Sequence, residues 1–204
     1  MIKLCGMRRI EDVQIINEFL PDHMGMILTA GFKRTVDIDT AKALADMTDS
    51  RIKKVGVFVN EPADNVKRVA EFLSLDVIQL HGDEDRAYIR SLDGICEVWK
   101  AVRVRSAEDI YRAEELGCQK LVLDSFVKGT AGGTGVVADW DIIKNAHISL
   151  PYFLAGGIGE HNIAKALEIC PNVDLSGSVE TDGVKDREKI RRVTELYRNR
   201  KEEP

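Results

Sequence analysis

The sequence has no long apolar run, no surplus of positive charge and few aromatic residues. Phe, Trp and Tyr make up 6% of the 204 residues, and 34 Asp and Glu outnumber 29 Lys and Arg. A chain with a net charge of −5, mixed along its length, gives no electrostatic reason to expect a nucleic-acid partner. No apolar stretch reaches the roughly 20 residues that a membrane-spanning helix needs, so we expect no membrane partner.

Cysteine is also scarce, and its spacing disfavours the usual cysteine-based sites. Of Cys5, Cys96, Cys118 and Cys170, no two form a Cys-x-x-Cys pair, and none has a zinc-binding spacing to a histidine. We therefore expect no metal site, and we expect the last three to fill apolar positions. The sequence opens directly into a strand-like run with no signal peptide before it, which favours a reduced, cytoplasmic setting.

What the sequence does contain is a regular alternation of strand-like and helix-like segments. Eight apolar runs alternate with eight amphipathic stretches, and no linker or change of composition interrupts them. The runs cover residues 2–5, 24–29, 54–59, 76–80, 97–103, 120–124, 152–155 and 173–175. Such alternation implies a parallel α/β sheet with helical crossovers. Eight units predict one closed (β/α)₈ TIM-barrel domain over residues 1–204.

An open, doubly wound sheet is the main alternative architecture. Such sheets usually carry a Gly-x-Gly-x-x-Gly loop after the first strand, where a dinucleotide binds. The residues after Cys5 read Gly6-Met7-Arg8-Arg9, which is a different pattern. We therefore prefer the barrel and expect no dinucleotide cofactor.

Two predicted strands end in side chains that are suited to acid–base chemistry. In a barrel all strand ends face one mouth, where active sites lie. The first strand ends in Cys5-Gly6 and the sixth in Asp124. A thiol can act as a base when positive neighbours lower its pKa, and a buried carboxyl with a raised pKa can act as an acid. Each also has a structural interpretation, Cys5 as a buried filler and Asp124 as a cap of the next turn.

Glycine-rich loops follow the last two predicted strands. They read Gly156-Gly157-Ile158-Gly159 and Ser176-Gly177-Ser178. Backbone N–H groups in such loops bind anions, and barrels frequently hold phosphate after strands seven and eight. The pattern favours a small phosphorylated substrate over ordinary turns. A third glycine loop, Gly129–Gly135, is expected to cover the mouth as a lid.

A guanidinium completes the set of groups expected at the mouth. Arg34 lies in the loop after the second strand, where it is either solvated or holds a substrate carboxylate bidentately. A thiol, a carboxyl and a guanidinium around a phosphorylated substrate suit proton shuttling. The sequence therefore favours an isomerisation, which needs no cofactor.

Seven short segments, spread in order over nearly the whole chain, support a more specific hypothesis. They are Lys3-Leu4-Cys5-Gly6, Gly56–Asn60, Gln79–Gly82, Leu123-Asp124, Gly132–Gly135, Ala155–Ile158 and Val179-Glu180. The set resembles the phosphoribosylanthranilate isomerase family of tryptophan biosynthesis. The resemblance implies an Amadori rearrangement of N-(5-phosphoribosyl)anthranilate to 1-(2-carboxyphenylamino)-1-deoxyribulose 5-phosphate. It allows a monomer or a homodimer.

The resemblance also implies roles for single residues. Asp124 would be the acid that protonates the furanose ring oxygen, so that the ring opens to a Schiff base. Cys5 would be the base that takes the proton from C2 of the sugar. Arg34 would hold the anthranilate carboxylate, and His81 would line the mouth. The phosphate would be bound by backbone groups around Gly156, Gly157, Ser176, Gly177 and Ser178.

The chain departs from the family pattern in two loops. Family members usually have Ser-Ser-Gly where this chain has Ser176-Gly177-Ser178, so the choice of phosphate-binding N–H groups stays open. Residues 29–33, before Arg34, read Thr-Ala-Gly-Phe-Lys, where family members commonly have a Ser-rich segment that contains Pro. Two other functions stay open beside the isomerase. One is the related histidine-pathway aldose–ketose isomerase, which uses carboxylates on both barrel halves. The other is a non-catalytic phosphate-binding barrel, which needs neither Cys5 nor Asp124.

Overall fold

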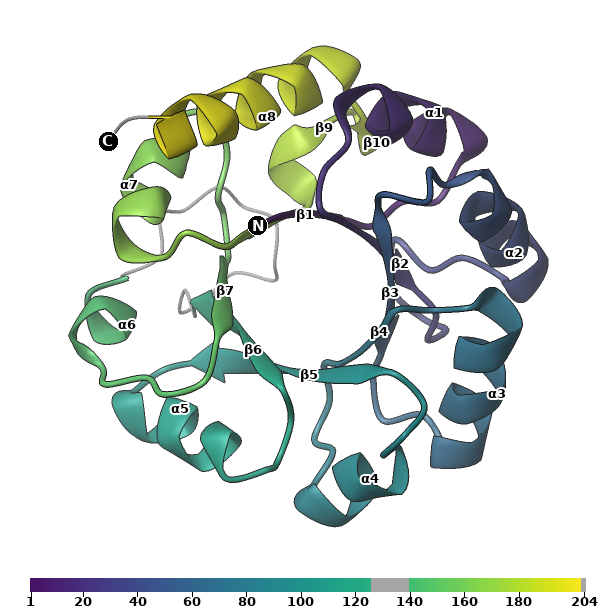
Figure 1. The fold of residues 1–204 in the computed structure, drawn as a ribbon, viewed down its shortest axis with the longest axis vertical. Helices are drawn as coiled ribbons and strands as arrows, with labels where there is room; N and C mark the ends of the chain where they lie inside the picture. The colour runs from purple at the N-terminus through teal and green to yellow at the C-terminus, as the bar shows by residue number, and fades with distance from the viewer. Residues whose placement is uncertain (126–139, 203–204) are drawn as a thin grey trace.

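The computed structural model describes residues 1–125 and 140–202, which form a closed barrel of parallel strands. The strands are joined in the order β1-β2-β3-β4-β5-β6-β7-β8, and β8 pairs with β1 to complete the ring (Figure 1). They are β1 (Ile2–Cys5), β2 (His23–Ile27), β3 (Lys53–Phe58), β4 (Val77–Leu80), β5 (Glu97–Val104), β6 (Lys120–Ser125), β7 (Tyr152–Ala155) and β8 (Val173–Leu175). The predicted (β/α)₈ fold is confirmed.

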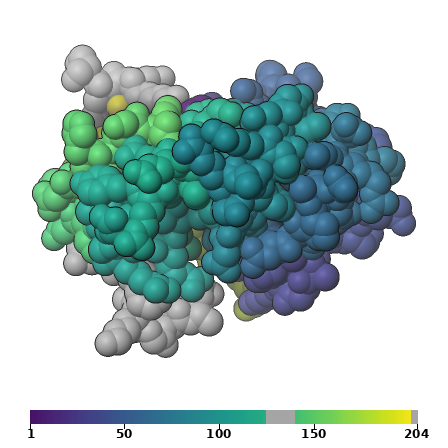
Figure 2. Space-filling view, turned by 90° about the horizontal axis from the view of Figure 1, so that it is seen from below, coloured from purple at the N-terminus to yellow at the C-terminus, as the bar shows by residue number. Residues whose placement is uncertain are grey.

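Helices form the outer ring, in chain order around the barrel (Figure 1). They are α1 (Ile10–Phe19), α2 (Ile38–Met47), α3 (Ala63–Leu73), α4 (Arg86–Ser91), α5 (Ala107–Glu114), α6 (Asp141–Asn145), α7 (Ile163–Ile169) and α8 (Arg187–Glu202). In the side view of Figure 2 the surfaces of successive units follow one another from blue through teal to green. Among the described residues, no helix has the length and apolar character to cross a membrane.

The strand bounds agree with the predicted runs to within one or two residues. The largest difference is in β2, which ends at Ile27 instead of Thr29. Thr29 turns out of the sheet because its hydroxyl accepts a hydrogen bond from the N–H of Val59 at 2.9 Å, and its carbonyl accepts one from the Thr35 hydroxyl. The chain thereby enters the loop that carries Arg34.

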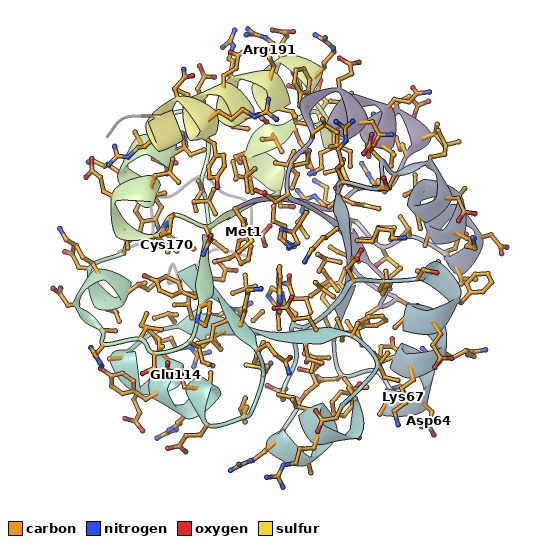
Figure 3. All side chains as sticks on the ribbon, in the orientation of Figure 1. Met1, Asp64, Lys67, Glu114, Cys170 and Arg191 are labelled. Carbon is orange, nitrogen blue, oxygen red and sulfur yellow. The ribbon has the colours of Figure 1, made fainter. Side chains whose placement is uncertain are left out.

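Side chains fill the barrel interior as well as the space between strands and helices (Figure 3). Because strand side chains alternate in direction, one set packs on the helices and the other faces inward. His23, Trp99 and Phe153, near the starts of their strands, pack together inside the barrel with ring centroids 4.8 to 5.6 Å apart. These rings fill the amino end of the interior, so the carboxyl end is left for a site.

A short hairpin after β8 is absent from the sequence-based prediction. The 3₁₀ turn η1 (Gly177–Val179) leads into β9 (Glu180–Thr181), which pairs antiparallel with β10 (Val184–Lys185). The connecting Asp182-Gly183 dipeptide is a strong hairpin signal that the sequence did offer. In Figure 1 the hairpin lies between α8 and α1, beside β1. It carries Glu180 and Lys185 to the barrel mouth.

The glycine loop predicted as a lid, Gly129–Gly135, lies outside the described residues. The predicted roles of three cysteines fit their burial. Cys118 and Cys170 are buried, and Cys96 is half-buried.

Candidate active site

The carboxyl ends of the strands surround a cavity of about 1110 Å³. Inward-facing residues of every barrel strand contribute to its wall, from Cys5 on β1 to Asp174 on β8. All nine site residues predicted from the sequence line this one cavity: Cys5, Arg34, His81, Asp124, Gly156, Gly157, Ser176, Gly177 and Ser178. The fold therefore brings together groups that are up to 173 positions apart in the chain (from 5 to 178).

Cys5 is the last residue of β1, and two glycines make room around it. A Cβ on Gly25, in the neighbouring strand, would lie 2.8 Å from the Cys5 Sγ atom. A Cβ on Gly6 would lie 2.6 Å from the Arg34 Cδ atom, and its φ of +82° favours glycine as well. The Cys5 thiol and the Arg34 guanidinium can lie on one side of the mouth because Gly6 and Gly25 have no side chains there.

The surroundings of the Cys5 thiol act on its pKa in opposite directions. Burial raises this pKa, and the nearby Asp174 carboxylate raises it further, whereas the ammonium groups of Lys3 and Lys185 oppose the increase. Lys3 faces the interior from the same strand, two residues before Cys5. The thiol is therefore protonated at neutral pH, with two cations beside it that would stabilise a thiolate.

Asp124 faces the same cavity from β6. Burial raises the pKa of its carboxyl, Asp174 adds to the increase, and Arg103 on β5 opposes it. Arg103 lies directly beside Asp124 in the register of the two strands. A raised pKa keeps more of the carboxyl protonated near neutral pH, which a general acid requires.

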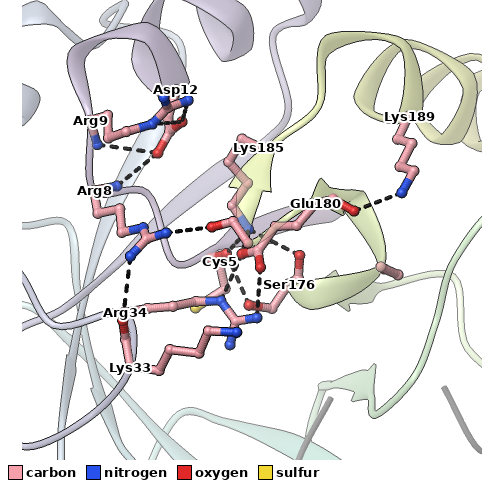
Figure 4. A network of polar contacts seen from close by, with 12 residues as sticks. Cys5, Arg8, Arg9, Asp12, Lys33, Arg34, Ser176, Glu180, Lys185 and Lys189 are labelled. Atoms are coloured by element: carbon pink, nitrogen blue, oxygen red, sulfur yellow. Dashed lines mark hydrogen bonds and ion pairs between the residues drawn. The ribbon is translucent and has the colours of Figure 1, made fainter. Parts of the chain in front are cut away.

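Arg34 forms a bidentate ion pair with Glu180 of the hairpin. Its Nε and Nη2 atoms lie 2.6 and 2.8 Å from the two carboxylate oxygens (Figure 4). Lys185 donates to the same carboxylate at 3.0 Å. Burial opposes ionisation of Glu180, but the two cations outweigh it and lower its pKa to about 2. The pair occupies the Nε–Nη2 edge of the guanidinium, so Nη1 is not engaged by it.

Lys185 connects the ends of the first and last strands. Its buried ammonium donates to the carbonyl oxygens of Cys5 at 2.7 Å and Ser176 at 3.0 Å. The Ser176 hydroxyl donates to the Cys5 carbonyl at 3.1 Å (Figure 4). The hairpin is thereby fastened to the strand that carries the thiol.

The two glycine loops predicted to bind phosphate lie against each other at the mouth. The Ser178 hydroxyl donates to the carbonyl of Ile158, which joins the loop after β8 to the loop after β7. Asn162 fixes the latter loop, since its side chain accepts from Gly159 N–H at 2.8 Å and donates to the Gly157 carbonyl at 3.1 Å. Backbone N–H groups of two loops can therefore converge on one anion.

Comparison of this sequence with known protein families identifies a family to which it belongs. Residues 2–196 match the family described as N-(5′-phosphoribosyl)anthranilate (PRA) isomerase. The chain belongs to this isomerase family. A relative named N-(5′-phosphoribosyl)anthranilate isomerase, from Thermoanaerobacter sp. (strain X514), is 40% identical over 199 residues, which are 97% of each chain. The predicted isomerase is confirmed at this level, since the family's reaction is the Amadori rearrangement of tryptophan biosynthesis.

Solved structures of the isomerase family agree with the fold. The phosphoribosylanthranilate isomerase of Thermotoga maritima superposes with a TM-score of 0.86 at 27% identity and covers 97% of this chain and 98% of its own. Another phosphoribosylanthranilate isomerase was solved with reduced 1-(o-carboxyphenylamino)-1-deoxyribulose 5-phosphate; it has a TM-score of 0.81 at 26% identity, with 97% and 98% coverage.

His81 follows β4, and its exposed side chain lines the wall of the isomerase cavity. Desolvation by the surrounding protein lowers its pKa to about 4, and the nearby cations of Lys3 and Lys100 contribute to the decrease, so the ring is neutral at neutral pH. The Gln79 amide nitrogen lies 3.3 Å from His81 Nδ1. A neutral imidazole has one N–H donor and one acceptor nitrogen. His81 can therefore offer a hydrogen bond but no charge to an isomerase substrate.

Several polar residues of the isomerase cavity were not predicted from the sequence. Gln79, Asp174 and Lys189 line it, and Lys3 lies beneath Cys5. Gln79, Asp174 and Lys3 each stand two positions before a predicted site residue (His81, Ser176 and Cys5) and so face the same side of a strand. This spacing was the available signal. Within the described residues, no group of three His, Cys, Asp or Glu side chains is arranged to hold a metal ion.

Proposed function

We propose that this chain performs the family's rearrangement with Asp124 as acid and Cys5 as base. The observation that supports the proposal is that both groups open into one cavity, beside a guanidinium and two glycine loops. The substrate is an aminoaldose with a phosphate at one end and an anthranilate carboxylate at the other. A guanidinium and two glycine loops in the same cavity as the acid–base groups match the two anionic groups of that substrate.

Asp124 starts the proposed reaction. Its proton goes to the furanose ring oxygen as the C1–O bond breaks, and the nitrogen lone pair forms the C=N bond of a protonated Schiff base. The raised pKa of Asp124 suits this step, because burial keeps a proton on the carboxyl. Asp124 is left as a carboxylate beside Arg103.

Cys5 acts on the open-chain Schiff base. Its thiol first releases a proton to water. The thiolate then takes the proton from C2, the C–H pair becomes the C1=C2 bond, and the C=N electrons return to nitrogen. The product of the step is an enolamine. Lys3 and Lys185, which oppose the raised pKa of Cys5, would stabilise the thiolate that this step consumes.

Arg34 and the glycine loops hold the two ends of the substrate in the proposed complex. The carboxylate of the anthranilate ring would meet the Nη1 side of Arg34, since Glu180 occupies the other edge. His81 lines the same cavity. The phosphate would accept hydrogen bonds from N–H groups around Gly156, Gly157, Ser176, Gly177 and Ser178.

Fluorescence of the anthranilate group tests the proposed function. Freshly prepared phosphoribosylanthranilate mixed with the purified chain is expected to lose its fluorescence with saturable kinetics. The histidine-pathway aminoaldose, assayed alongside by absorbance, is expected to be converted far more slowly. Preference for that second substrate, or binding of product with no turnover of either compound, would contradict the proposal.

We also propose that residues 1–204 are a single domain that acts in the cytoplasm as a monomer or a homodimer, and that it needs no cofactor. The closed barrel formed by the described residues supports one domain. Sedimentation velocity distinguishes one chain from two.

A further inference from the structure

Asp174 is a largely buried carboxylate, and only one of its two oxygens has a hydrogen-bond partner in the described part of the chain. It lies in the middle of β8, and one oxygen, Oδ2, accepts a hydrogen bond from the Lys3 ammonium at 2.7 Å. The Lys3 side chain is 0% exposed and that of Asp174 is 10% exposed. The second oxygen, Oδ1, is buried with no hydrogen-bond partner among the described residues. Asp174 also lines the active-site cavity.

The strand register places this carboxylate at the same level of the barrel as the proposed acid. Asp124 pairs with Ala155 on β7, and Leu154 pairs with Val173, so Asp174 comes next to Ala155. The two carboxyls are thus two strands apart, about 10 Å between Cα atoms, with only the small Ala155 between them. On its other side Asp174 pairs with Lys3, two residues before Cys5. The acid, the base and Asp174 therefore surround the same part of the cavity.

A purely structural ion pair between Lys3 and Asp174 would not require one carboxylate oxygen to be left without a partner. A buried carboxylate oxygen without a partner is unfavourable, and such groups in folded proteins are usually satisfied by protein, water or ligand. Lys3 fixes the orientation of the carboxylate through Oδ2. Oδ1 is left for a hydrogen-bond donor that enters the cavity, and the proposed substrate brings sugar hydroxyls.

We propose that Asp174 Oδ1 binds the C2 hydroxyl of the substrate and takes its proton in the final tautomerisation. This inference rests on the proposed function. In the enolamine, Asp174 removes the proton of the C2 hydroxyl, and the electron pair of that O–H bond forms the C2=O double bond. The C1=C2 pair then takes a proton at C1 from the Cys5 thiol, which gained one in the preceding step.

The proposed sequence is balanced in protons. Asp124 gives one proton to the ring oxygen, Asp174 receives one from the C2 hydroxyl, and Cys5 ends as it began. Exchange with water resets the two carboxyls. Burial raises the pKa of Asp174, although Lys3 opposes the increase, so this carboxylate accepts a proton more readily than a solvated one.

The test variant is Asp174→Asn, which keeps the shape of the side chain but removes the base. We expect kcat to fall about 100-fold with a much smaller change in KM. With substrate deuterated at C2, the variant should release label to water faster than it forms product, because Cys5 still acts while the last step is slow. Wild type should form product faster than unreacted substrate loses label.

Asp22→Asn is the matched control. The Asp22 carboxylate accepts a hydrogen bond from the Ile2 N–H at 2.6 Å, at the other end of β1, so its loss should leave the partition of label unchanged. If Asp174→Asn loses label release and product formation in equal proportion, or keeps wild-type kcat, the proposal is wrong. A wild-type chain that does not convert phosphoribosylanthranilate would instead refute the proposed function.

A binding measurement on the wild-type chain keeps the test independent of how the variant folds. Reduced 1-(o-carboxyphenylamino)-1-deoxyribulose 5-phosphate retains a hydroxyl at C2, and its 2-deoxy form lacks it. We expect the first to bind about tenfold more tightly, as for a hydrogen bond to a charged acceptor. Equal affinities would show that Oδ1 does not hold the C2 hydroxyl and would overturn the proposal.

Discussion

Burial has opposite chemical consequences for Cys5 on β1 and for Asp124 on β6. Burial raises the pKa of both groups. The raised pKa keeps Asp124 protonated, as a general acid must be. The raised pKa of Cys5 keeps it as a thiol, whereas a general base must be a thiolate. The Asp174 carboxylate lies near both groups, but Cys5 has two ammonium groups to oppose it, whereas Asp124 has one guanidinium. Burial raises both pKa values, and the charged neighbours determine whether each group can act as an acid or as a base.

Replacing Cys5 by Ala should have the largest effect on turnover. We expect kcat to fall about 10⁴-fold, because abstraction of a proton from carbon has no substitute once the base is gone. Anthranilate fluorescence measures the loss. Cys118→Ala, a buried thiol outside the cavity, is the control and should keep kcat. Near-normal turnover by the Cys5 variant would refute its role as base.

Asp124→Asn should be the next most damaging change. We expect kcat to fall about 10³-fold, less than for Cys5→Ala, because ring opening of an aminoaldose also proceeds slowly in water. Substrate supplied in a trapped open-chain form should bypass the defect. If the open-chain form reacts no faster than the ring form with this variant, Asp124 does not act on ring opening.

Glu180→Gln should separate binding from chemistry. Glu180 holds the Arg34 guanidinium bidentately, and the amide can replace only one of the two charged contacts. We expect KM to rise about tenfold with kcat nearly unchanged, because Arg34 is proposed to act on binding and not on proton transfer. Glu188→Gln, on the exposed face of α8, is the control for loss of a carboxylate. A large fall in kcat with constant KM would contradict this division.

Substitution of the charged neighbours should have the smallest effects on turnover. These variants test most directly whether the neighbours set the pKa values of Cys5 and Asp124. Lys185→Met and Arg103→Met each remove a cation that lowers a pKa, so the pKa of Cys5 should rise in the first and that of Asp124 in the second. At neutral pH the first variant should lose activity several-fold, because less thiolate forms, while the second should change less than threefold.

The pH dependence of alkylation and turnover measures these shifts. Iodoacetamide labelling of Cys5 should need a higher pH in Lys185→Met than in wild type. In Arg103→Met the limb of kcat/KM that reports the acid should move to higher pH, since the carboxyl stays protonated further up the scale. A downward shift in either variant would mean that the cation does not act on the group assigned to it.

Much of the site could be predicted because strand ends and loops have local signatures. Apolar runs that end in Cys5 or Asp124, and glycines directly after β7, are visible in sequence, and a parallel barrel gathers such ends at one mouth. The hairpin was missed although Asp182-Gly183 marked it, because its strands are two residues each and show no periodicity. Lys3 and Asp174 were missed because each stands inside a strand that otherwise reads as apolar.

The sequence by itself determined the alternation of strands and helices, the polar tips and the anion-binding loops, since these depend on neighbours within a few residues. Only the tertiary structure decided which groups meet and in what ionisation state. Arg34 and Glu180 are 146 positions apart, and Lys3 and Asp174 are 171 apart. The pKa of a buried group depends on desolvation and on charges within a few ångströms, and the closing of β8 onto β1 sets both for Cys5.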